Sequence, residues 1–306
     1  MYLLALCQPI ALYFTAPLIS GINRVARARL HNRRGPGVLQ EYRDLFKLLS
    51  RQSVAPADSG WVFRLMPFLM TGILLIIATA LPVITLASPL SLSGDLITLL
   101  YLFALARFFF LIAGLDTGSP FTAIGASREA ALGVLTEPCL LLSLWVAGQV
   151  AGSTHISNIA RCYELWPTAH SLTLVLACIA CAFATMIETG RLPFDLAEAE
   201  QELQEGVLCE YSGAGFALVK WSISFRQLVV LQMFVGVFFP WGEMKIFTMA
   251  GLALAVTIAL IKLVAGSLII ALCENSMARL RMSALPRVTW FGFGLAFLAY
   301  VSLLAA

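Results

Sequence analysis

The sequence predicts an all-α integral membrane protein, a bundle of about eight transmembrane helices with long cytoplasmic loops. Three observations lead to this fold class. Hydrophobic residues make up 60% of the 306 residues and charged residues only 12%, whereas a soluble globular chain carries about a quarter charged residues. The apolar residues gather in runs of about 20, the length of a helix that crosses a bilayer. These runs show no sustained alternation of apolar and polar residues, which disfavours a membrane barrel.

Eight segments have the length and composition of a membrane span, and we expect them to form a single domain over residues 1–306. In chain order they are Leu3–Ile22, Val62–Leu86, Leu96–Gly114, Ala130–Ala151, Ser171–Thr189, Gly215–Pro240, Phe247–Cys273 and Val288–Leu304. The first segment lacks the basic start and the cleavage site of a signal peptide, so we expect a retained helix. The composition excludes a soluble enzyme and a disordered chain. A net charge of +3 also excludes a nucleic-acid binder that relies on excess positive charge.

The positions of the basic residues predict which loops face the cytoplasm. Thirteen lie in the first, third, fifth and seventh loops: Arg24, Arg27, Arg29, Arg33, Arg34, Arg43, Lys47, Arg51, Arg128, Arg191, Arg279, Arg281 and Arg287. The loops on the other side hold only Arg161 and Lys245. Because basic residues collect on the cytoplasmic side, we expect these odd-numbered loops in the cytoplasm. Eight spans then place both termini in the periplasm, in a multi-pass protein of the bacterial inner membrane.

Seven charged residues fall in or at the expected spans. They are Arg64, Arg107, Glu137, Glu188, Lys220, Arg226 and Lys262. Arg64 lies near a helix end, where its side chain can reach the membrane surface. A charge at mid-membrane costs at least about 3 kcal/mol, so we expect the others to face the bundle interior or a hydrated cavity. They are candidates for moving ions, and structural pairing between helices is the alternative.

The first cytoplasmic loop is expected to contain an amphipathic helix. Leu39, Tyr42, Leu45, Phe46 and Leu49 recur at helical spacing, with charged residues between them. Such a helix lies on the membrane or under a partner protein. A basic anchor on anionic lipid is one interpretation. The length of the loop favours the other, a docking surface for a soluble protein, with candidate residues Arg24, Arg27, Arg29, Arg33, Arg34, Asp44 and Lys47.

The fifth loop is acidic. Six of the chain's 17 acidic residues fall within 16 positions: Asp195, Glu198, Glu200, Glu202, Glu205 and Glu210. The spacing predicts a helix with a capping box of Asp195 and Glu198 and an end at Gly206. Clustered carboxylates raise one another's pKa, as a proton relay near neutral pH requires. A solvated acidic helix that faces a basic patch on a partner explains the same spacing equally well.

The sequence offers no set of ligands for a redox cofactor. None of the three histidines, His31, His155 and His170, falls in a span, which argues against a haem ligated within the bundle. Cys178 and Cys181 are three positions apart in the fifth span, but no second cysteine pair accompanies them. We interpret them as small packed residues, and expect neither a bound cofactor nor a catalytic residue in this chain.

Three stretches of the sequence resemble the respiratory complex I subunit 1 family. The stretch from Glu188 to Gly213 is similar to the family's acidic loop, N-R-x-P-F-D-L-x-E-x-E-x-E-L followed by E-Y-S-G. Gly125, Arg128 and Glu137 match a G-x-x-R motif and the Glu nine residues after its Arg. Residues 33–47 resemble R-x-G-P followed by L-Q-x-x-x-D-x-x-K. Together with the charged residues discussed above, the resemblance gives the proton-coupling candidates Arg128, Glu137, Glu188, Asp195, Glu198, Glu200, Glu202, Glu210 and Lys220.

Several positions depart from the family pattern. Gln52 stands where the respiratory enzymes have an acid, Gly190 replaces an Asn, and Lys220 replaces a Glu. The R-Y-D-Q expected after Leu285-Pro286-Arg287 is missing. In the quinone-reducing members this subunit shapes the quinone chamber, so these losses put quinone binding in doubt.

As a whole, the chain is more similar to the membrane subunits of group 4 [NiFe] hydrogenases, the formate hydrogenlyase branch. The resemblance implies as partners a [NiFe] hydrogenase large subunit, an iron–sulfur small subunit, ferredoxin-like subunits, an antiporter-like membrane subunit and a formate dehydrogenase. The [NiFe] centre and the iron–sulfur clusters would lie in those partners.

We therefore expect a non-catalytic membrane-anchor subunit that docks the hydrogenase arm through residues 23–61 and 190–214. Proton coupling by this subunit is a second hypothesis. One alternative is a quinone-site subunit of an NADH:quinone oxidoreductase. Another is a self-sufficient ion channel or transporter, which the long docking loops fit poorly.

Overall fold

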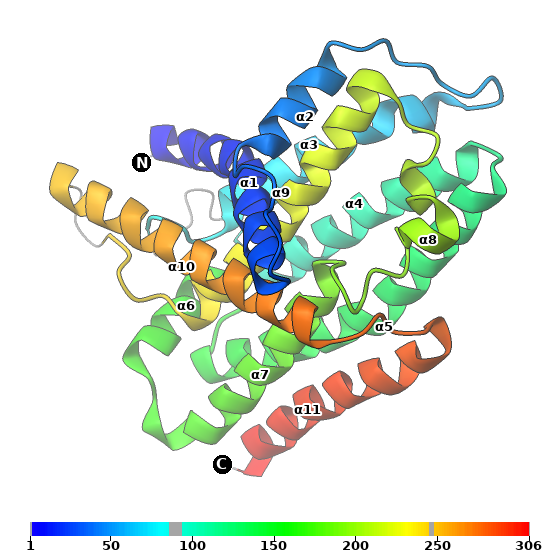
Figure 1. Ribbon diagram of the computed structural model, residues 1–306. Coiled ribbons are helices and arrows are strands. Elements are labelled where there is room, and N and C mark those ends of the chain that lie inside the picture. The colour runs from blue at the N-terminus through cyan, green and yellow to red at the C-terminus, as the bar shows by residue number, and fades with distance from the viewer. Residues whose placement is uncertain (1, 86–93, 245–247, 306) are drawn as a thin grey trace.

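The computed structural model describes residues 2–85, 94–244 and 248–305, apart from the side chains of residues 2–6, 200 and 201 (Figure 1). Within these ranges the chain forms helices and no strand. The helices are α1 Tyr2–Leu30, α2 Gln40–Leu49, α3 Trp61–Ala80, α4 Leu96–Asp116, α5 Pro120–Ala151, α6 Ile156–Leu165, α7 Ser171–Glu188, α8 Glu200–Leu203, α9 Gly213–Phe238, α10 Met249–Ser276 and α11 Leu285–Ala305. Short 3-10 turns cover Thr168–His170, Gly206–Leu208 and Met282–Ala284.

Seven helices of the described chain are long and apolar enough to cross a membrane: α3, α4, α5, α7, α9, α10 and α11. This confirms the predicted fold class. The expected first span, Leu3–Ile22, lies within α1, a helix of 29 residues that packs on α3, α9 and α10. The side chains of the first residues of that span are not among those that the structure describes. The expected end of the second span at Leu86 and the expected start of the seventh at Phe247 also lie outside the described residues. The orientation of the termini stays a prediction.

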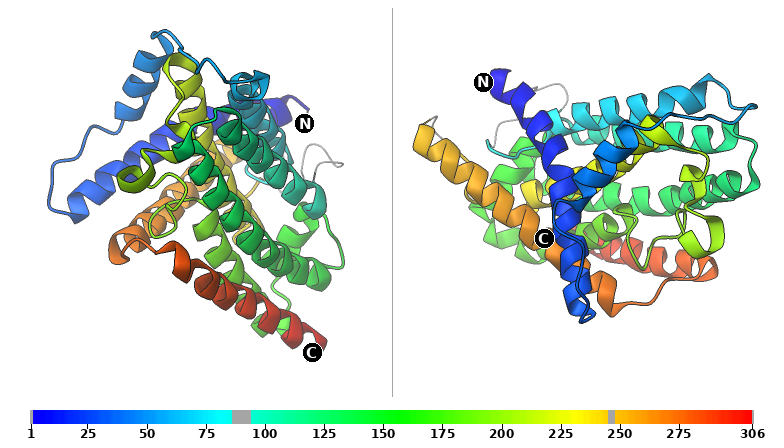
Figure 2. Two further views of the ribbon diagram at one scale, coloured as in Figure 1. Left: turned by 90° about the vertical axis from the view of Figure 1, so that its right-hand side faces the viewer. Right: turned by 45° about the horizontal axis from the view of Figure 1, so that its top comes forward.

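Helix α9 lies at the centre of the bundle (Figures 1 and 2). In the most apolar 18-residue stretch of α9, 72% of the residues are buried, whereas the corresponding stretches of α10 and of α11 have 22% of their residues buried. Helices α5, α7 and α11 pack against one another, and α3 and α4 form a second pair beside α9. One large apolar cluster joins these helices. Because α10 and α11 leave most of their apolar surface uncovered, they lie at the periphery, where lipid or another membrane subunit meets the bundle.

The amphipathic helix expected in the first loop is confirmed as α2. Leu45 is buried against Ala217 and Trp221 of α9. Phe46, the next residue along the helix, is 61% exposed. The chain before α2 crosses α1 closely, since a Cβ on Gly21 would lie 2.0 Å from the carbonyl oxygen of Val38. Tertiary packing thus fixes this helix on the bundle.

The acidic loop does not form the predicted helix. Residues 190–199 form turns and irregular backbone, and α8 covers only four residues before the 3-10 turn at Gly206–Leu208, so the predicted helix from Asp195 to Gly206 is wrong. The cause is packing that overrides local propensity. Phe194 and Leu196 are buried together with Ile187 in a small apolar cluster, so the segment folds into the bundle. The carboxylate of Asp195 lies 2.7 Å from Nη2 of Arg279 instead of capping a helix.

Candidate functional site

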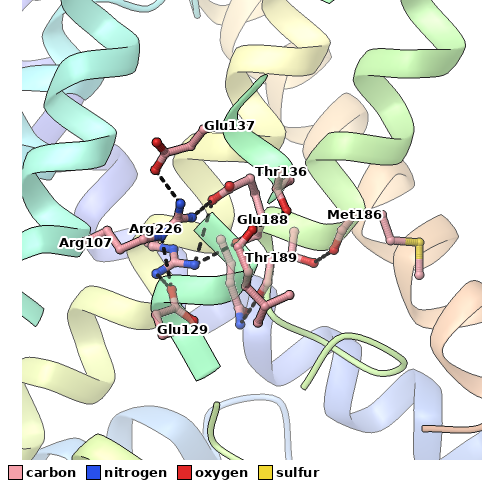
Figure 3. Close-up of polar contacts among 10 residues, drawn as sticks. Arg107, Glu129, Thr136, Glu137, Met186, Glu188, Thr189 and Arg226 are labelled. Carbon is pink, nitrogen blue, oxygen red and sulfur yellow. Dashed lines mark hydrogen bonds and ion pairs between the residues drawn. The ribbon is translucent and has the colours of Figure 1, made fainter. Parts of the chain in front are cut away.

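A buried charge cluster lies where α4, α5, α7 and α9 meet (Figure 3). The side chain of Arg107 on α4 is 9% exposed, and it contacts three carboxylates. Its Nη1 lies 2.5 Å from Oε1 of Glu137, and its Nη2 lies 2.5 Å from Oε2 of Glu188. Its Nε lies 3.4 Å from Oε1 of Glu129. One guanidinium therefore ties α4 to α5 and α7.

Arg226 of α9 is the second cation of this cluster. Its Nη1 donates to Oε1 of Glu129 at 2.9 Å, and its Nη2 donates to the backbone oxygen of Glu188 at 3.1 Å. We call the five residues Arg107, Glu129, Glu137, Glu188 and Arg226 the inner cluster. Three carboxylates against two guanidiniums leave one excess negative charge when all are ionised. Burial of like charges favours binding of a proton to one of the carboxylates. Oε1 of Glu188 is buried without a hydrogen-bond partner, so the two guanidiniums satisfy this carboxylate only in part.

The sequence of α5 explains how one helix supplies two of the carboxylates. Glu129, Gly133 and Glu137 are four residues apart, so they lie on one face. The glycine between the two acids makes room for Arg107, because a Cβ on Gly133 would lie 2.4 Å from its Nη1. The arrangement therefore depends on a residue without a side chain as much as on the charged ones.

Glu137 is the most exposed member of the inner cluster. Its side chain is 37% exposed, against 5% for Glu188. On the same face of α5, Val134 is 73% and Leu141 is 44% exposed. The cluster therefore reaches the outer surface of the bundle in the middle of a membrane span.

A chamber of about 730 Å³ lies beside the inner cluster, between α1, α2, α9, α10 and residues 190–208. We call it the charged chamber. Its lining includes six basic and six acidic residues: Arg24, Arg27, Lys47, Arg191, Lys220, Arg279, Glu41, Asp44, Asp195, Glu198, Glu205 and Glu274. Most of these charges are paired, for example Arg27 with Glu274 at 2.9 Å and Arg24 with Glu41 at 2.9 Å. Such a lining favours water and ions.

Glu198 lies between the charged chamber and the inner cluster. It lines the chamber and also a small cavity of about 30 Å³ that Glu129 and Arg226 line from the other side. That volume is enough for a water molecule. Burial, and then the negative charge of Asp195, raise the pKa of Glu198 to about 8. Glu198 can therefore take up and release a proton near neutral pH.

Other residues of the acidic loop lie outside the inner cluster. Nη1 of Arg128 lies 2.6 Å from Oε2 of Glu202, and this bond lowers the pKa of the exposed Glu202 carboxyl. The side chain of Glu200 falls outside those that the structure describes. Glu210 lines neither the chamber nor the small cavity. Lys220 lines the chamber, 3.8 Å from Oε1 of Glu205, with its ammonium over the ring of Phe216.

The candidate docking residues divide into two groups. Arg24, Arg27, Asp44 and Lys47 line the charged chamber. The remaining three, Arg29, Arg33 and Arg34, are exposed at the end of α1 and in the turn that follows it.

Sequence reasoning missed Glu129, Gln227 and Glu274. The first two prove central: Glu129 belongs to the inner cluster, and Gln227 accepts hydrogen bonds from Arg191. Glu129 escaped because the fourth span was predicted to begin at Ala130, whereas α5 begins at Pro120. Proline after Ser119 is a common start of a helix, and it would have extended the span far enough to place Glu129 and Glu137 on one face. Among the residues that the structure describes, no group of three or more His, Cys, Asp or Glu is arranged to hold a metal ion.

Comparisons with known proteins place these observations in context. The family described as NADH dehydrogenase matches residues 2–305. Formate hydrogenlyase subunit 4 of Escherichia coli (strain K12) is 72% identical over 301 residues, which are 98% of this chain and 98% of that protein. Hydrogenase-4 component C of the same organism is 50% identical over 302 residues, covering 98% and 95%. A chain of the membrane-bound sulfane sulfur reductase, an archaeal respiratory membrane complex, has the same fold, with a TM-score of 0.86, 23% identity and 99% coverage of both chains.

Proposed function

The chain belongs to the NADH dehydrogenase family, the family of complex I subunit 1, and from this we propose that it is the membrane subunit of a formate hydrogenlyase-type complex. In this proposal it anchors a hydrogenase arm and couples electron transfer in that arm to proton movement. The identity of 72% with formate hydrogenlyase subunit 4 over nearly the whole chain supports the assignment. The partners would be the [NiFe] large subunit, the iron–sulfur small subunit, ferredoxin-like subunits, a formate dehydrogenase and an antiporter-like membrane subunit. The redox centres would belong to the partners.

The surface of the first loop supports the docking role. Phe46 on α2 is 61% exposed and Trp61 at the start of α3 is 69% exposed. Basic residues of the same loop are also exposed, among them Arg33 and Arg43. Protein interfaces combine an apolar centre with a polar rim, and aromatic and arginine side chains are enriched in them. The composition of this surface is therefore suited to binding the soluble hydrogenase arm.

Co-purification tests this assignment. After extraction of native membranes in mild detergent, a tagged copy of this chain is expected to bring down a [NiFe] hydrogenase subunit and a formate dehydrogenase. Recovery of NADH dehydrogenase subunits instead would favour the alternative, a quinone-site subunit. The chamber volume suits a small-molecule ligand. Its twelve charged lining residues count against an apolar quinone.

The contact between the charged chamber and the inner cluster is the observation that carries the coupling role. A proton from the cytoplasm would enter the chamber and bind Glu198, whose carboxyl pKa of about 8 suits exchange near neutral pH. A water in the small cavity would carry the proton on to Glu129. Arg107 joins Glu129 to Glu188 and Glu137, so the proton would then redistribute within the inner cluster.

The exposure of Glu137 indicates where the proton would leave. A carboxylate in contact with lipid is costly, so this face of the bundle should be covered by protein in the complex. The outer sides of α4 and α5 carry exposed apolar side chains, including Phe108 at 53% and Val134 at 73%. We assign this face to the antiporter-like membrane subunit, which would receive the proton from Glu137.

Replacement of Glu188 tests the coupling role. In inverted membrane vesicles that hold the complex, formate would drive hydrogen evolution, and a pH-sensitive dye reports proton movement. Glu188→Gln is expected to lower the number of protons moved per hydrogen evolved by about a hundredfold, the lower end of what a proton-transfer group contributes. Glu164→Gln, at the end of α6 and away from both sites, is the control. A wild-type ratio in Glu188→Gln would count against coupling through the inner cluster.

A further inference from the structure

The end of α7, where Glu188 lies, is held by two consecutive side chains of α9. The last carbonyl groups of a helix have no partner within the helix. Nη2 of Arg226 donates to the backbone oxygen of Glu188 at 3.1 Å, and Nε2 of Gln227 donates to the backbone oxygen of Thr189 at 3.0 Å. The position of the Glu188 carboxylate therefore depends on α9 as well as on its own helix.

Gln227 also faces the charged chamber. Its Oε1 accepts from Nε of Arg191 at 3.1 Å and from Nη2 of the same guanidinium at 2.8 Å. Nη1 of Arg191 lies 3.8 Å from Oε2 of Glu274, and Oε1 of Glu274 lies 2.9 Å from Nη1 of Arg27. A continuous chain of polar contacts thus runs from α1 through α10 to α9 and ends at the last turn of α7.

The two ends of this chain of contacts differ in exposure. The side chain of Arg27 is 41% exposed, whereas that of Glu274 is 4% exposed. Oε2 of Glu274 is buried without a hydrogen-bond partner. A change of charge or of contact at the exposed Arg27 therefore acts on the buried carboxylate of Glu274. Through Glu274 it also acts on Arg191. Because charges interact strongly away from water, such a change displaces the neighbouring groups.

We propose that Gln227 is a positioning residue for Glu188. Through Gln227, a displacement of the charged groups that line the chamber changes the position of Glu188 in the inner cluster. This inference rests on the proposed coupling function. A glutamine does not titrate, so Gln227 carries no proton. Its rigid amide group joins Arg191 to the Thr189 carbonyl, and a displacement of Arg191 moves the end of α7. The distance between Glu188 and Arg107, now 2.5 Å, then changes, and with it the strength of the ion pair inside the inner cluster.

The arrangement separates two routes between the same two sites. Glu198 offers the route for the proton, through the small cavity, and Gln227 offers the mechanical link. A partner that docks over the chamber can therefore alter the proton affinity of the inner cluster through contacts with Arg27 alone. The prediction that distinguishes this role from simple helix capping is a change in the pH dependence of coupling, since a cap that only adds stability leaves that dependence unchanged.

The test compares Gln227→Leu and Gln227→Glu with a matched control in the assembled complex. Gln232 lies on the same helix, is 3% exposed, and its Nε2 likewise donates to a backbone oxygen, that of Pro82 at 2.6 Å. Gln232→Leu therefore removes a buried bond of the same kind outside the chain of contacts. Gln227→Glu keeps an acceptor for Arg191 and, when ionised, has no donor for the Thr189 carbonyl.

Formate-driven proton movement per hydrogen evolved is measured in inverted vesicles between pH 6 and 8. Both Gln227 variants are expected to lower the ratio by about threefold and to shift its pH midpoint by about half a unit, because a displaced ion-pair partner changes the proton affinity of a carboxylate by about this factor. Gln232→Leu is expected to keep the wild-type midpoint. Should Gln227→Leu fail to accumulate in the membrane, Gln227→Glu carries the test.

The proposal is overturned if the Gln227 variants show the ratio and the pH midpoint of Gln232→Leu. Glu188→Gln measured in the same series separates this failure from a failure of the proposed function. If Glu188→Gln lowers the ratio and neither Gln227 variant does, only the positioning role is wrong. If Glu188→Gln keeps the wild-type ratio, the coupling function is wrong and the positioning role falls with it.

Discussion

The inner cluster and the charged chamber are built from the same residue types and differ in balance and in contact with water. The inner cluster has three acids and two bases, with Arg107 only 9% exposed. The chamber has six of each, and Arg24 in its wall is 43% exposed. An excess carboxylate in a buried site favours a bound proton, whereas an exposed pair of the chamber wall, such as Arg24 with Glu41, is weakly coupled. A carboxylate–guanidinium pair therefore has a functional role in the inner cluster, whereas an exposed pair of the same kind in the chamber wall is a modest surface contact.

Removal of the central cation should show the largest difference between the two regions. Arg107→Met leaves three carboxylates without that partner in the membrane, and loss of one partner of a buried ion pair costs about 3–5 kcal/mol. We expect little folded protein in the membrane, measured as the yield of monodisperse protein in detergent. Arg24→Met removes an exposed pair, worth about 1 kcal/mol or less, and should accumulate normally. Equal yields would mean that the inner cluster is as accessible to water as the chamber.

A methyl group added beside Arg107 should have the next largest effect. Gly133→Ala places a Cβ 2.4 Å from the guanidinium, so Arg107 must shift away from Glu137. We expect a loss of about 1–3 kcal/mol, as for other cases of overpacking, measured by thermal unfolding in detergent. Gly72→Ala on α3 is the control, because nothing lies within 4 Å of its added Cβ. Its stability should equal or exceed that of the wild type.

Stability as a function of pH tests Glu198, which lies between the two regions. A carboxyl whose pKa rises to about 8 on folding binds a proton more tightly in the folded state. Its contribution is therefore fully present below the unfolded pKa, near 4.3, and is lost as pH rises toward 8, with a slope of up to about 1.4 kcal/mol per pH unit. Glu198→Gln should flatten thermal stability between pH 5 and 8.

Glu202→Gln is the matched control for that measurement. Arg128 lowers the pKa of the Glu202 carboxyl, so its contribution is present at neutral pH and is lost only as pH falls through the lowered value. The slope between pH 5 and 8 should therefore stay that of the wild type. A wild-type slope in Glu198→Gln as well would show that Glu198 is ionised in the folded protein.

The smallest effect is expected at the exposed basic residues. Arg33→Ala combined with Arg34→Ala removes two exposed charges from the docking loop, each worth about 0.2–1 kcal/mol. The hydrogenase subunits should then leave washed membranes at lower salt concentration than in the wild type. Arg161→Ala, on α6 at the other side of the bundle, should leave that concentration unchanged. A wild-type salt dependence of the double variant would locate docking elsewhere.

The helices could be predicted from the sequence because each is a long apolar run. The inner cluster could be predicted only in part. Glu137 and Glu188 stand out as charges within apolar spans, and so does Arg107. Glu129 does not, since it follows Arg128 at the edge of a span, and only the true start of α5 places it on the face of Glu137.

The acidic loop shows the limit of local reasoning. Its spacing of acids fits a helix, yet Phe194 and Leu196 are buried by residues far along the chain, and that packing decides the conformation. The role of Gln227 has no local signal either, because its three hydrogen bonds join segments more than 30 residues away.

Protons are proposed to pass through the inner cluster during turnover, and Glu129 offers the sharpest test of this because only the structure places it in the cluster. The measurement is the number of protons moved per hydrogen evolved in inverted vesicles carrying Glu129→Gln. Glu129 stands between the small cavity and both guanidiniums, so we expect the ratio to fall by about a hundredfold, the lower end of what a proton-transfer group contributes. A ratio equal to that of the wild type, in vesicles that evolve hydrogen from formate, would exclude proton transfer through the inner cluster.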